Sequence, residues 1–370
     1  MERKIALTNG IIYTSTAILK HSTVLISGNR INQIIHNTAI PQGYEIVDLQ
    51  GANVCPGFID LQIYGWKNQL FSAELTNESL ANIEESLLRE GTTSFYITLA
   101  TNEITVFKKA IDIYNNHTKR NVLGLHLEGP FLNPAKRGAH PEDLIFTPSI
   151  EVVEDLLHKA DDAVKMITIA PELMSDEVIT CILDKEILLS VGHSAASFAE
   201  ANASFEKGIK AVTHLWNAMS PLHHREGGLP AAVSNHQSVC ASIIVDGIHV
   251  DYEVVKLSKA LLGKRLFLIT DAVAACEKGI YQHIFNGDHY VLPDRTLSGS
   301  ALTLLKAIQN CVTHVGIALD EAIRMATLYP AALIGRVDLG HIVVGAKANL
   351  VIFDNEYQIL QVIFEGETVL

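Results

Sequence analysis

The chain has 370 residues, of which 48% are hydrophobic and 19% are charged, and this balance excludes a largely disordered protein. Its formal net charge of -13 disfavours a nucleic-acid partner, because an acidic surface repels phosphate backbones. The five cysteines are odd in number and form no CxxC pair, which favours reduced thiols in a cytoplasmic enzyme. No apolar run is long enough for a membrane span, so no membrane association is expected.

Both ends of the chain have the pattern of β structure. The first 50 residues contain short β-branched runs separated by Asn-Gly and Gly-Asn turn signals, and the last 35 residues look similar. Two strand-rich ends around a different middle predict one small β-sandwich domain built from residues 1–51 and 335–370. The expected strands are Lys4–Leu7, Gly10–Tyr13, Val24–Ser27, Arg30–Ile35, Ala348–Asp354 and Ile359–Phe364.

The middle of the chain, residues 52–334, alternates short apolar runs with longer helical patterns. Eight strands that alternate with helices predict an α/β fold, a parallel (β/α)8 barrel of the TIM type. A doubly wound open sheet is the alternative, but no Gly-x-Gly-x-x-Gly or P-loop pattern is present. The expected barrel strands are Phe58–Ile63, Thr93–Thr98, Val122–Leu127, Val164–Ile169, Ile187–Val191, Ala211–Thr213, Val239–Ile244 and Leu266–Ile269. The expected helices include Asn77–Glu90, Glu103–Asn115, Ile150–Ala160, Ser197–Lys207, Tyr252–Leu262 and Ala301–His314.

Polar residues follow four of these strands at their carboxyl ends, where barrel enzymes carry their active sites. Glu128 ends the third strand, and Asp271 follows the eighth. His193 and His214 follow the fifth and sixth. Any one of these residues alone is more often a helix cap or a satisfied polar group. Two imidazoles and a carboxylate on one rim, however, are a standard catalytic zinc or iron arrangement, so the set predicts a metal-dependent active site.

The first barrel strand departs from a common metal-binding pattern. In metal-dependent hydrolase barrels this segment often reads Pro-Gly-x-x-Asp-x-His-x-His, and both histidines bind metal. Gln62 and Tyr64 stand at those two positions here. Glutamine is a poor zinc ligand, and a tyrosine would first have to lose its proton. A two-metal site therefore loses its usual support.

These motifs resemble the amidohydrolase superfamily and, within it, the family of N-acetylglucosamine-6-phosphate deacetylases. The resemblance covers essentially the whole chain, and the HLEGP and THLxNAM segments are highly specific to that family. It rests on Pro56–Asp60, Gly124–Phe131, Gly192–Ser194, Thr213–Met219, Asp246–His249, Thr270–Ala272 and Leu297–Ser300.

The resemblance implies a metal site and its chemistry. It implies that Glu128, His193 and His214 hold one divalent metal ion per subunit, with zinc expected and iron as the alternative. It also implies that Asp271 is the catalytic base and acid for a metal-activated water. One-metal members more often have Asn where Tyr64 stands, which leaves the role of Tyr64 open.

Other residues are expected to contact the substrate. His140, in the loop after the third strand, matches the family histidine that donates a hydrogen bond to the acyl oxygen. The resemblance implies that Arg225 and His249 contact the phosphate of the sugar, with Asn217 and the backbone amide of Ala218 assisting. It also implies a homodimer, because the phosphate site in this family often draws on a neighbouring subunit.

The expected activity is hydrolysis of N-acetylglucosamine 6-phosphate to glucosamine 6-phosphate and acetate. The nearest alternative is a related amidohydrolase that acts on N-acetylgalactosamine 6-phosphate or on another N-acyl substrate. A second alternative is a non-catalytic scaffold that has lost its metal. The complete set of three expected metal ligands and Asp271 disfavours the scaffold.

Overall fold

The computed structural model describes residues 3–36, 39–160 and 162–370. The chain divides into two compact units, and their segments alternate along the sequence. The first unit comprises Met1–Asp60, Glu85–Ser94 and Leu304–Leu370, and the second comprises Leu61–Glu84 and Phe95–Thr303. The domain limits expected from the sequence, with a barrel over residues 52–334, stay a prediction.

The strands from the two ends of the chain form two sheets of their own. A four-stranded sheet has the order β5-β4-β1-β6, and a six-stranded sheet has the order β23-β22-β21-β7-β2-β3. One apolar cluster includes residues of both sheets, such as Ile5, Val24, Val54 and Ile352, as in a β-sandwich. The strands are β1 Lys4–Thr8, β2 Ile11–Tyr13, β3 Ile18–Leu19, β4 Ser22–Ser27, β5 Arg30–His36, β6 Glu45–Asp48, β7 Asn53–Pro56, β21 Leu350–Phe353, β22 Ile359–Phe364 and β23 Glu367–Thr368.

The middle of the chain forms an eight-stranded sheet with the order β17-β16-β15-β14-β13-β12-β11-β8. The register of neighbouring strands from β11 to β17 is parallel throughout. A parallel bridge between Ile63 and Ala272 brings the two ends of the sheet together, so the sheet is a nearly closed barrel and the predicted fold class is confirmed. The strands are β8 Phe58–Ile63, β11 Thr92–Ala100, β12 Val122–Glu128, β13 Val164–Ile169, β14 Leu188–Val191, β15 Ala211–Val212, β16 Cys240–Ile243 and β17 Leu266–Leu268.

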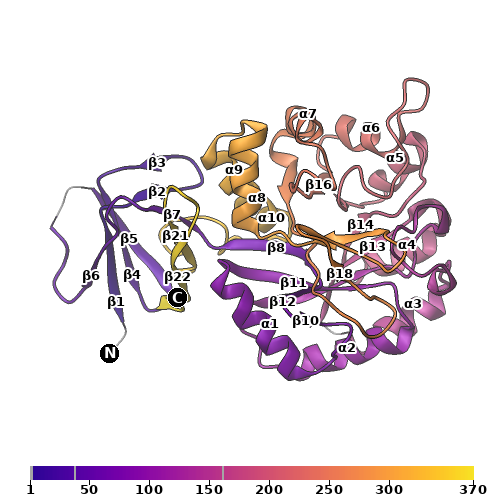
Figure 1. Ribbon diagram of the computed structural model, residues 1–370, viewed down its shortest axis with the longest axis horizontal. Helices are drawn as coiled ribbons and strands as arrows, with labels where there is room; N and C mark the ends of the chain where they lie inside the picture. The colour runs from indigo at the N-terminus through magenta and orange to yellow at the C-terminus, as the bar shows by residue number, and fades with distance from the viewer. Residues whose placement is uncertain (1–2, 37–38, 161) are drawn as a thin grey trace. The chain divides into compact units, whose positions relative to one another are not determined.

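Helices α2 to α7 lie around the outside of the parallel strands (Figure 1). Local signals start several of them, because the side chains of Ser149, Ser175, Ser197 and Asp251 each accept a backbone N–H of the first turn. The predicted helix Ala301–His314 is α8 followed by a π-helical turn. The sequence-based expectation omitted α4, α6, α9 and α10. The helices are α1 Asn77–Arg89, α2 Ile104–Asn116, α3 Ile150–Leu157, α4 Asp176–Leu183, α5 Phe198–Glu206, α6 Gly228–Asn235, α7 Tyr252–Leu262, α8 Leu304–Asn310, α9 Leu319–Ala326 and α10 Leu328–Leu333.

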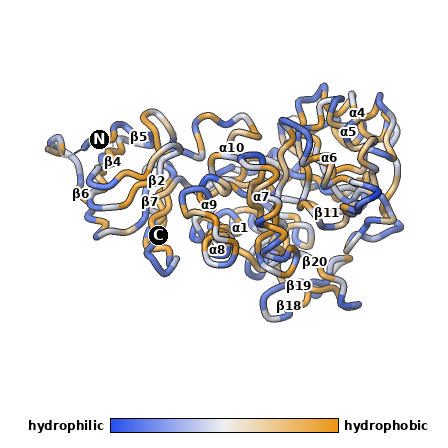
Figure 2. The backbone as a smooth tube through the Cα atoms, turned by 90° about the horizontal axis from the view of Figure 1, so that it is seen from above, coloured by the Kyte–Doolittle hydropathy of each residue, from blue (hydrophilic) through white to orange (hydrophobic). Residues whose placement is uncertain are grey.

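A small antiparallel sheet follows the last barrel strand. Its strands are β18 Ile284–Phe285, β19 His289–Val291 and β20 Leu297–Ser300, and Figure 2 shows it standing out from the rest of the second unit. A bridge from Ser300 to Ala272 ties β20 to the segment after β17. The two-residue pair β9 Gly65–Trp66 and β10 Gln69–Leu70 follows the first barrel strand. Both small sheets therefore extend from the carboxyl ends of barrel strands.

In the part of the chain that the structure describes, no helix combines the length and the apolar character that crossing a membrane requires.

Candidate active site

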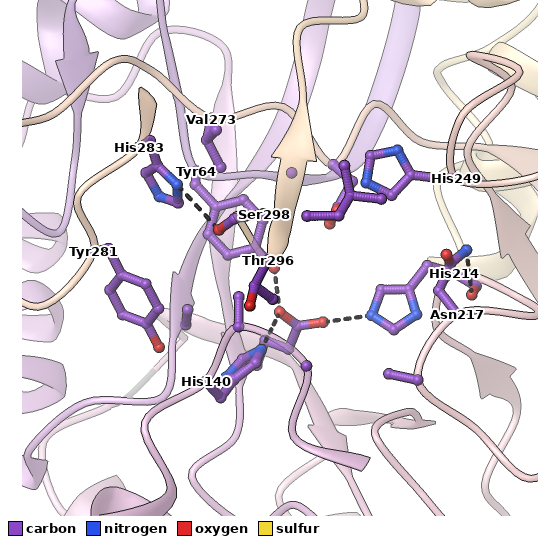
Figure 3. A pocket seen from close by; sticks show the side chains of 18 of the residues that line it. Tyr64, His140, His214, Asn217, His249, Val273, Tyr281, His283, Thr296 and Ser298 are labelled. Atoms are coloured by element: carbon purple, nitrogen blue, oxygen red, sulfur yellow. Dashed lines mark hydrogen bonds and ion pairs between the residues drawn. The ribbon is translucent and has the colours of Figure 1, made fainter. Parts of the chain in front are cut away.

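A cavity of about 310 Å³ opens at the carboxyl ends of the barrel strands, and every residue that lines it belongs to the second unit. Eight of the nine site residues expected from the sequence line this cavity: Glu128, His140, His193, His214, Asn217, Ala218, His249 and Asp271. Figure 3 labels four of them, His140, His214, Asn217 and His249. Arg225 is the ninth. It is exposed in the loop before α6 and is not part of the lining. The structure thus brings together residues that are up to 143 positions apart, from Glu128 to Asp271.

Four of these residues have unusual backbone conformations. The φ angles are 48° at His193, 34° at His214, 48° at Ala218 and 54° at Asp271. Residues other than glycine rarely adopt a positive φ angle. Each such residue raises the free energy of the folded state by about 1–3 kcal/mol where its backbone is strained. The surrounding fold maintains these conformations, which set the directions in which the two imidazoles and the carboxylate leave the backbone.

The Glu128 carboxylate lies at the centre of the site, and it is buried. Its Oε1 atom lies 3.0 Å from His214 Nε2 and 3.4 Å from His193 Nε2. Its Oε2 atom lies 3.2 Å from His140 Nε2 and accepts a hydrogen bond from the Tyr64 hydroxyl. Burial by itself would raise the pKa of Glu128, but the His193 charge and hydrogen bonds from the three imidazoles hold this pKa well below its usual range.

Three donor atoms of this cluster have the spacing of metal ligands. Glu128 Oε1, His193 Nε2 and His214 Nε2 are 3.0, 3.1 and 3.4 Å apart, and tetrahedral zinc with bonds of about 2.0–2.1 Å places its ligand atoms about 3.3 Å apart. The Nδ1 atom of His193 lies 2.9 Å from the Lys136 carbonyl oxygen. Because that carbonyl can only accept, Nδ1 carries a proton, and a metal that displaces the proton of Nε2 would find the lone pair of that nitrogen directed at Glu128 Oε1. The residues present therefore fit one divalent ion.

His140 lies in the same cluster, and Glu128, His140 and His193 each offer a donor atom within 4.8 Å of the others. The position of the proton on its ring distinguishes His140 from the proposed metal ligands. The Thr101 backbone N–H donates to His140 Nδ1 at 3.3 Å, and the Thr101 hydroxyl lies 2.8 Å from the same nitrogen. Nδ1 is therefore the acceptor, and Nε2 carries the proton. Burial lowers the pKa of His140 to about 4, so at neutral pH the ring presents a neutral N–H to the cavity.

Gln62 and Tyr64, whose roles the sequence left open, lie between the two acidic groups. Gln62 Nε2 donates to Asp271 Oδ1 at 2.7 Å and to Glu128 Oε1 at 3.0 Å. It also lies 3.0 Å from the Tyr64 hydroxyl. Burial, together with the charges of Glu128 and Asp271, raises the pKa of Tyr64 well above its usual value. Tyr64 is therefore a neutral phenol that donates a hydrogen bond to Glu128.

His249 lines the opposite side of the cavity from Tyr281 and His283 (Figure 3). Its Nδ1 lies 2.6 Å from Asp246 Oδ2. Asp246 Oδ1 accepts the backbone N–H groups of Ile248 and His249 at 2.9 and 2.8 Å. Burial opposes ionisation of Asp246, but the hydrogen bond and charge of His249 outweigh it and lower the Asp246 pKa. Asp246 was not among the site residues expected from the sequence, although its position three residues before His249 was the available signal.

The cavity has an apolar recess, which we define as the side formed by Tyr64, Leu70, Ala100, Val273 and Tyr281. These buried residues belong to one apolar cluster. The Tyr281 hydroxyl donates to the Thr101 carbonyl oxygen at 2.7 Å, and the Tyr64 hydroxyl donates to Glu128. Because both phenols use their hydroxyl groups within the protein, apolar ring surface is left for a ligand.

Two further groups around the site, Glu172 and His283, were not among the residues expected from the sequence. Glu172 accepts hydrogen bonds from the Ala195 N–H and the Ser194 hydroxyl, both at 2.7 Å, and so supports the loop that carries His193. His283 pairs with the Ser298 hydroxyl at 3.1 Å on the cavity wall. Glu172 follows a barrel strand as His193 does, so its position in the sequence could have marked it as a site residue. The loop that carries His283 has no sequence pattern that would have marked that residue.

Comparison with known proteins agrees with this geometry. The model of the amidohydrolase family matches residues 53–369, and a model described as the NagA composite domain matches residues 5–54. The chain belongs to the amidohydrolase family.

Two similar relatives have the same name. The N-acetylglucosamine-6-phosphate deacetylase of Haemophilus influenzae is 37% identical, with 98% of this chain and 99% of the relative covered. The deacetylase of the same name from Bos taurus is 32% identical, with coverage of 87% and 84%. The predicted resemblance is confirmed.

Two solved structures of that name also match. The enzyme from Pasteurella multocida has a TM-score of 0.94 at 35% identity, with 99% of each chain covered. A mutant of the Mycobacterium smegmatis enzyme, in complex with N-acetyl-D-glucosamine-6-phosphate, has a TM-score of 0.91 at 27% identity, with 100% of each chain covered.

Proposed function

We propose that this chain is a metal-dependent hydrolase that removes the acetyl group from N-acetylglucosamine 6-phosphate, giving glucosamine 6-phosphate and acetate. The observation that carries the proposal is the triangle of Glu128 Oε1, His193 Nε2 and His214 Nε2 next to Asp271 and the His140 N–H. Relatives and structures with the name of this activity match nearly the whole chain, which supports the same substrate.

In this proposal Glu128, His193 and His214 hold one divalent metal ion per subunit, with zinc preferred over iron. When bound, the ion would polarise the acyl oxygen and lower the pKa of a water to about 7. Gln62 links Glu128 to Asp271 through hydrogen bonds of 3.0 and 2.7 Å, which brings the base next to the ligands. Asp271 takes the proton of the attacking water and then delivers it to the departing nitrogen.

His140 is the donor to the acyl oxygen. Its Nε2–H lies 3.2 Å from Glu128 Oε2, and in this proposal it turns to the acyl oxygen on which negative charge develops. Donors of this kind contribute on the order of 10²–10³ in rate. Tyr281 donates to Thr101, and Thr101 in turn holds His140. The apolar recess is therefore next to the acyl oxygen, and we place the methyl group of the acetyl there.

The sugar phosphate extends to the other side of the cavity. His249 contacts it there, with Asn217 and the backbone N–H of Ala218 assisting, since all three line the cavity. Arg225 is exposed in the loop between β15 and α6 and would have to fold over the phosphate to bind it. We further propose a homodimer and a cytoplasmic location with reduced cysteines. All five cysteines are free thiols, which supports the latter.

A deacylation panel tests the function. Metal-loaded protein is incubated with N-acetylglucosamine 6-phosphate, N-acetylgalactosamine 6-phosphate and the two unphosphorylated sugars, and the released amine and the bound metal are measured on the same preparation. We expect the highest kcat/KM with N-acetylglucosamine 6-phosphate. Faster turnover of the galactosamine epimer would favour the related amidohydrolase. A protein that binds no zinc or iron and releases no amine would favour a non-catalytic scaffold.

A further inference from the structure

Tyr64 is the residue at which this chain departs from both the two-metal pattern, with its paired histidines, and the one-metal pattern, with asparagine. It is buried, as are Gln62 and Glu128. The two oxygens of Glu128 have different neighbours. Oε1 faces the Nε2 atoms of His193 and His214, whereas Oε2 faces the Tyr64 hydroxyl and His140 Nε2.

We propose that Tyr64 is a positioning residue that holds Glu128 through Oε2, while Gln62 supports Oε1 from the side of Asp271, so that Oε1 alone is offered to a single metal ion. The inference rests on the proposed function, because it concerns the metal site assigned there. It assigns a role to Tyr64 that the family pattern does not supply.

The geometry of the hydrogen bonds supports this role. A carboxylate can rotate about its last bond, and two orientations of Glu128 would present either one or both oxygens to a cation. The hydroxyl of Tyr64 donates to Oε2 and the amide of Gln62 donates to Oε1. These two donors come from residues on one face of the first strand and its continuation, so the carboxylate is held in a single orientation. Buried hydrogen bonds to a charged group are among the strong ones.

Substrate binding makes the Tyr64 contact more important. In the structure His140 Nε2 also lies 3.2 Å from Glu128 Oε2. When His140 turns its N–H to the acyl oxygen, Oε2 loses that donor. Tyr64 then remains as the donor to Oε2, and the orientation of Glu128 is preserved through the reaction.

The same donors occupy the region where a second cation would need to bind. Such an ion would need oxygen atoms of Glu128 and Asp271 together, and Gln62 Nε2 lies within 2.7 Å of Asp271 Oδ1 and 3.0 Å of Glu128 Oε1. The Gln62 N–H directed at Asp271 Oδ1 and the Tyr64 O–H directed at Glu128 Oε2 repel a second cation from these two oxygens. Neutral hydrogen-bond donors thus take the place of the second ion, and one metal per chain follows.

The test measures metal binding without turnover. Wild-type protein and the nearly isosteric variant Tyr64→Phe are stripped of metal and titrated with zinc in competition with a chromophoric chelator. We expect wild-type protein to bind one equivalent and Tyr64→Phe to bind it roughly 10–100-fold more weakly, the usual loss when an outer partner of a metal ligand is removed. Thermal unfolding of the metal-free proteins checks that the variant folds.

Tyr281→Phe is the matched control. It removes another buried phenol hydroxyl from the same cavity, but that hydroxyl donates to the Thr101 carbonyl and not to Glu128, so zinc affinity should be unchanged. If Tyr64→Phe does not fold, Gln62→Met keeps the side-chain length, removes the amide donor and should show the same loss.

Several results would overturn the inference: zinc affinity in Tyr64→Phe equal to that of wild type, an equal loss in Tyr281→Phe, or a second tight equivalent of zinc in wild type. A tyrosinate signal in the ultraviolet difference spectrum on zinc addition would also overturn it, because Tyr64 would then be a ligand. Wild-type protein that binds no zinc and no iron would refute the proposed function itself.

Discussion

Asp271 combines two features that a reactive carboxylate needs. One oxygen accepts a hydrogen bond of 2.7 Å from Gln62, which sets its direction, and the side chain lines the cavity next to the proposed ligands. Its backbone has a φ of 54°, a conformation that asparagine and aspartate tolerate better than most residues. An amide in place of the carboxylate therefore preserves the shape of the site and removes its basicity.

We predict that Asp271→Asn lowers kcat by about 10²–10⁴-fold, the usual contribution of a general acid and base. Zinc content should stay near that of wild-type protein, because Asp271 is not one of the three proposed ligands. Rates on N-acetylglucosamine 6-phosphate and metal analysis of the same samples check both expectations. Full activity in this variant would remove Asp271 from the proton transfers.

The Asp246–His249 pair gives a prediction for pH. The folded-state pKa of Asp246 is lowered, since His249 outweighs the effect of burial. The ionised Asp246 carboxylate therefore contributes its full stability above the unfolded pKa of about 3.9, and this contribution is lost as the pH falls through the folded pKa. Asp246→Asn should be less stable than wild type at neutral pH, and the difference should shrink below about pH 4. Urea unfolding at several pH values measures it, and a constant difference would contradict the assignment.

At the scale of elements, the cavity is built from segments that follow barrel strands. The β9–β10 pair supplies Leu70, the loop after β12 supplies His140, and the small sheet that ends in β20 supplies Ser298. The eight barrel strands matched the predicted ones to within about two residues, because each is a short buried run bounded by turn residues. The small sheet was not predicted, since its strands have only two to four residues, too short for a periodic pattern.

The apolar recess leads to a prediction about the acyl group. Leu70→Ala enlarges the recess, so kcat/KM for an N-propionyl substrate relative to the N-acetyl substrate should rise about 10-fold or more. Ile244→Val is the matched control, because Ile244 lines the cavity but is not in the apolar cluster of the recess. Kinetics on both sugar phosphates give the ratio. An unchanged ratio in Leu70→Ala would show that the acyl group lies elsewhere. If this variant is unstable, Val273→Ala provides a smaller enlargement.

At the scale of the whole molecule, the metal should act as a ligand of the folded state. The proposed ligands come from the ends of β12, β14 and β15, and only the folded barrel brings them together. An ion at 100 times its Kd stabilises the state that binds it by about 2.7 kcal/mol. We expect chelation to lower Tm and added zinc to restore it. Thermal denaturation with and without chelator measures the shift, and an unchanged Tm would argue against a metal held by these residues.

The sequence by itself determined the fold class and identified eight of the residues that line the cavity. Strand-end residues such as Glu128 and Asp271 could be found because a barrel places the carboxyl ends of its strands on one rim. The tertiary structure decided what individual atoms do. The Thr101 N–H settles which nitrogen of His140 carries the proton, and Tyr64 acquires a role only because Glu128, 64 residues away, lies against its hydroxyl. Such contacts join distant segments, and no local pattern of residues encodes them.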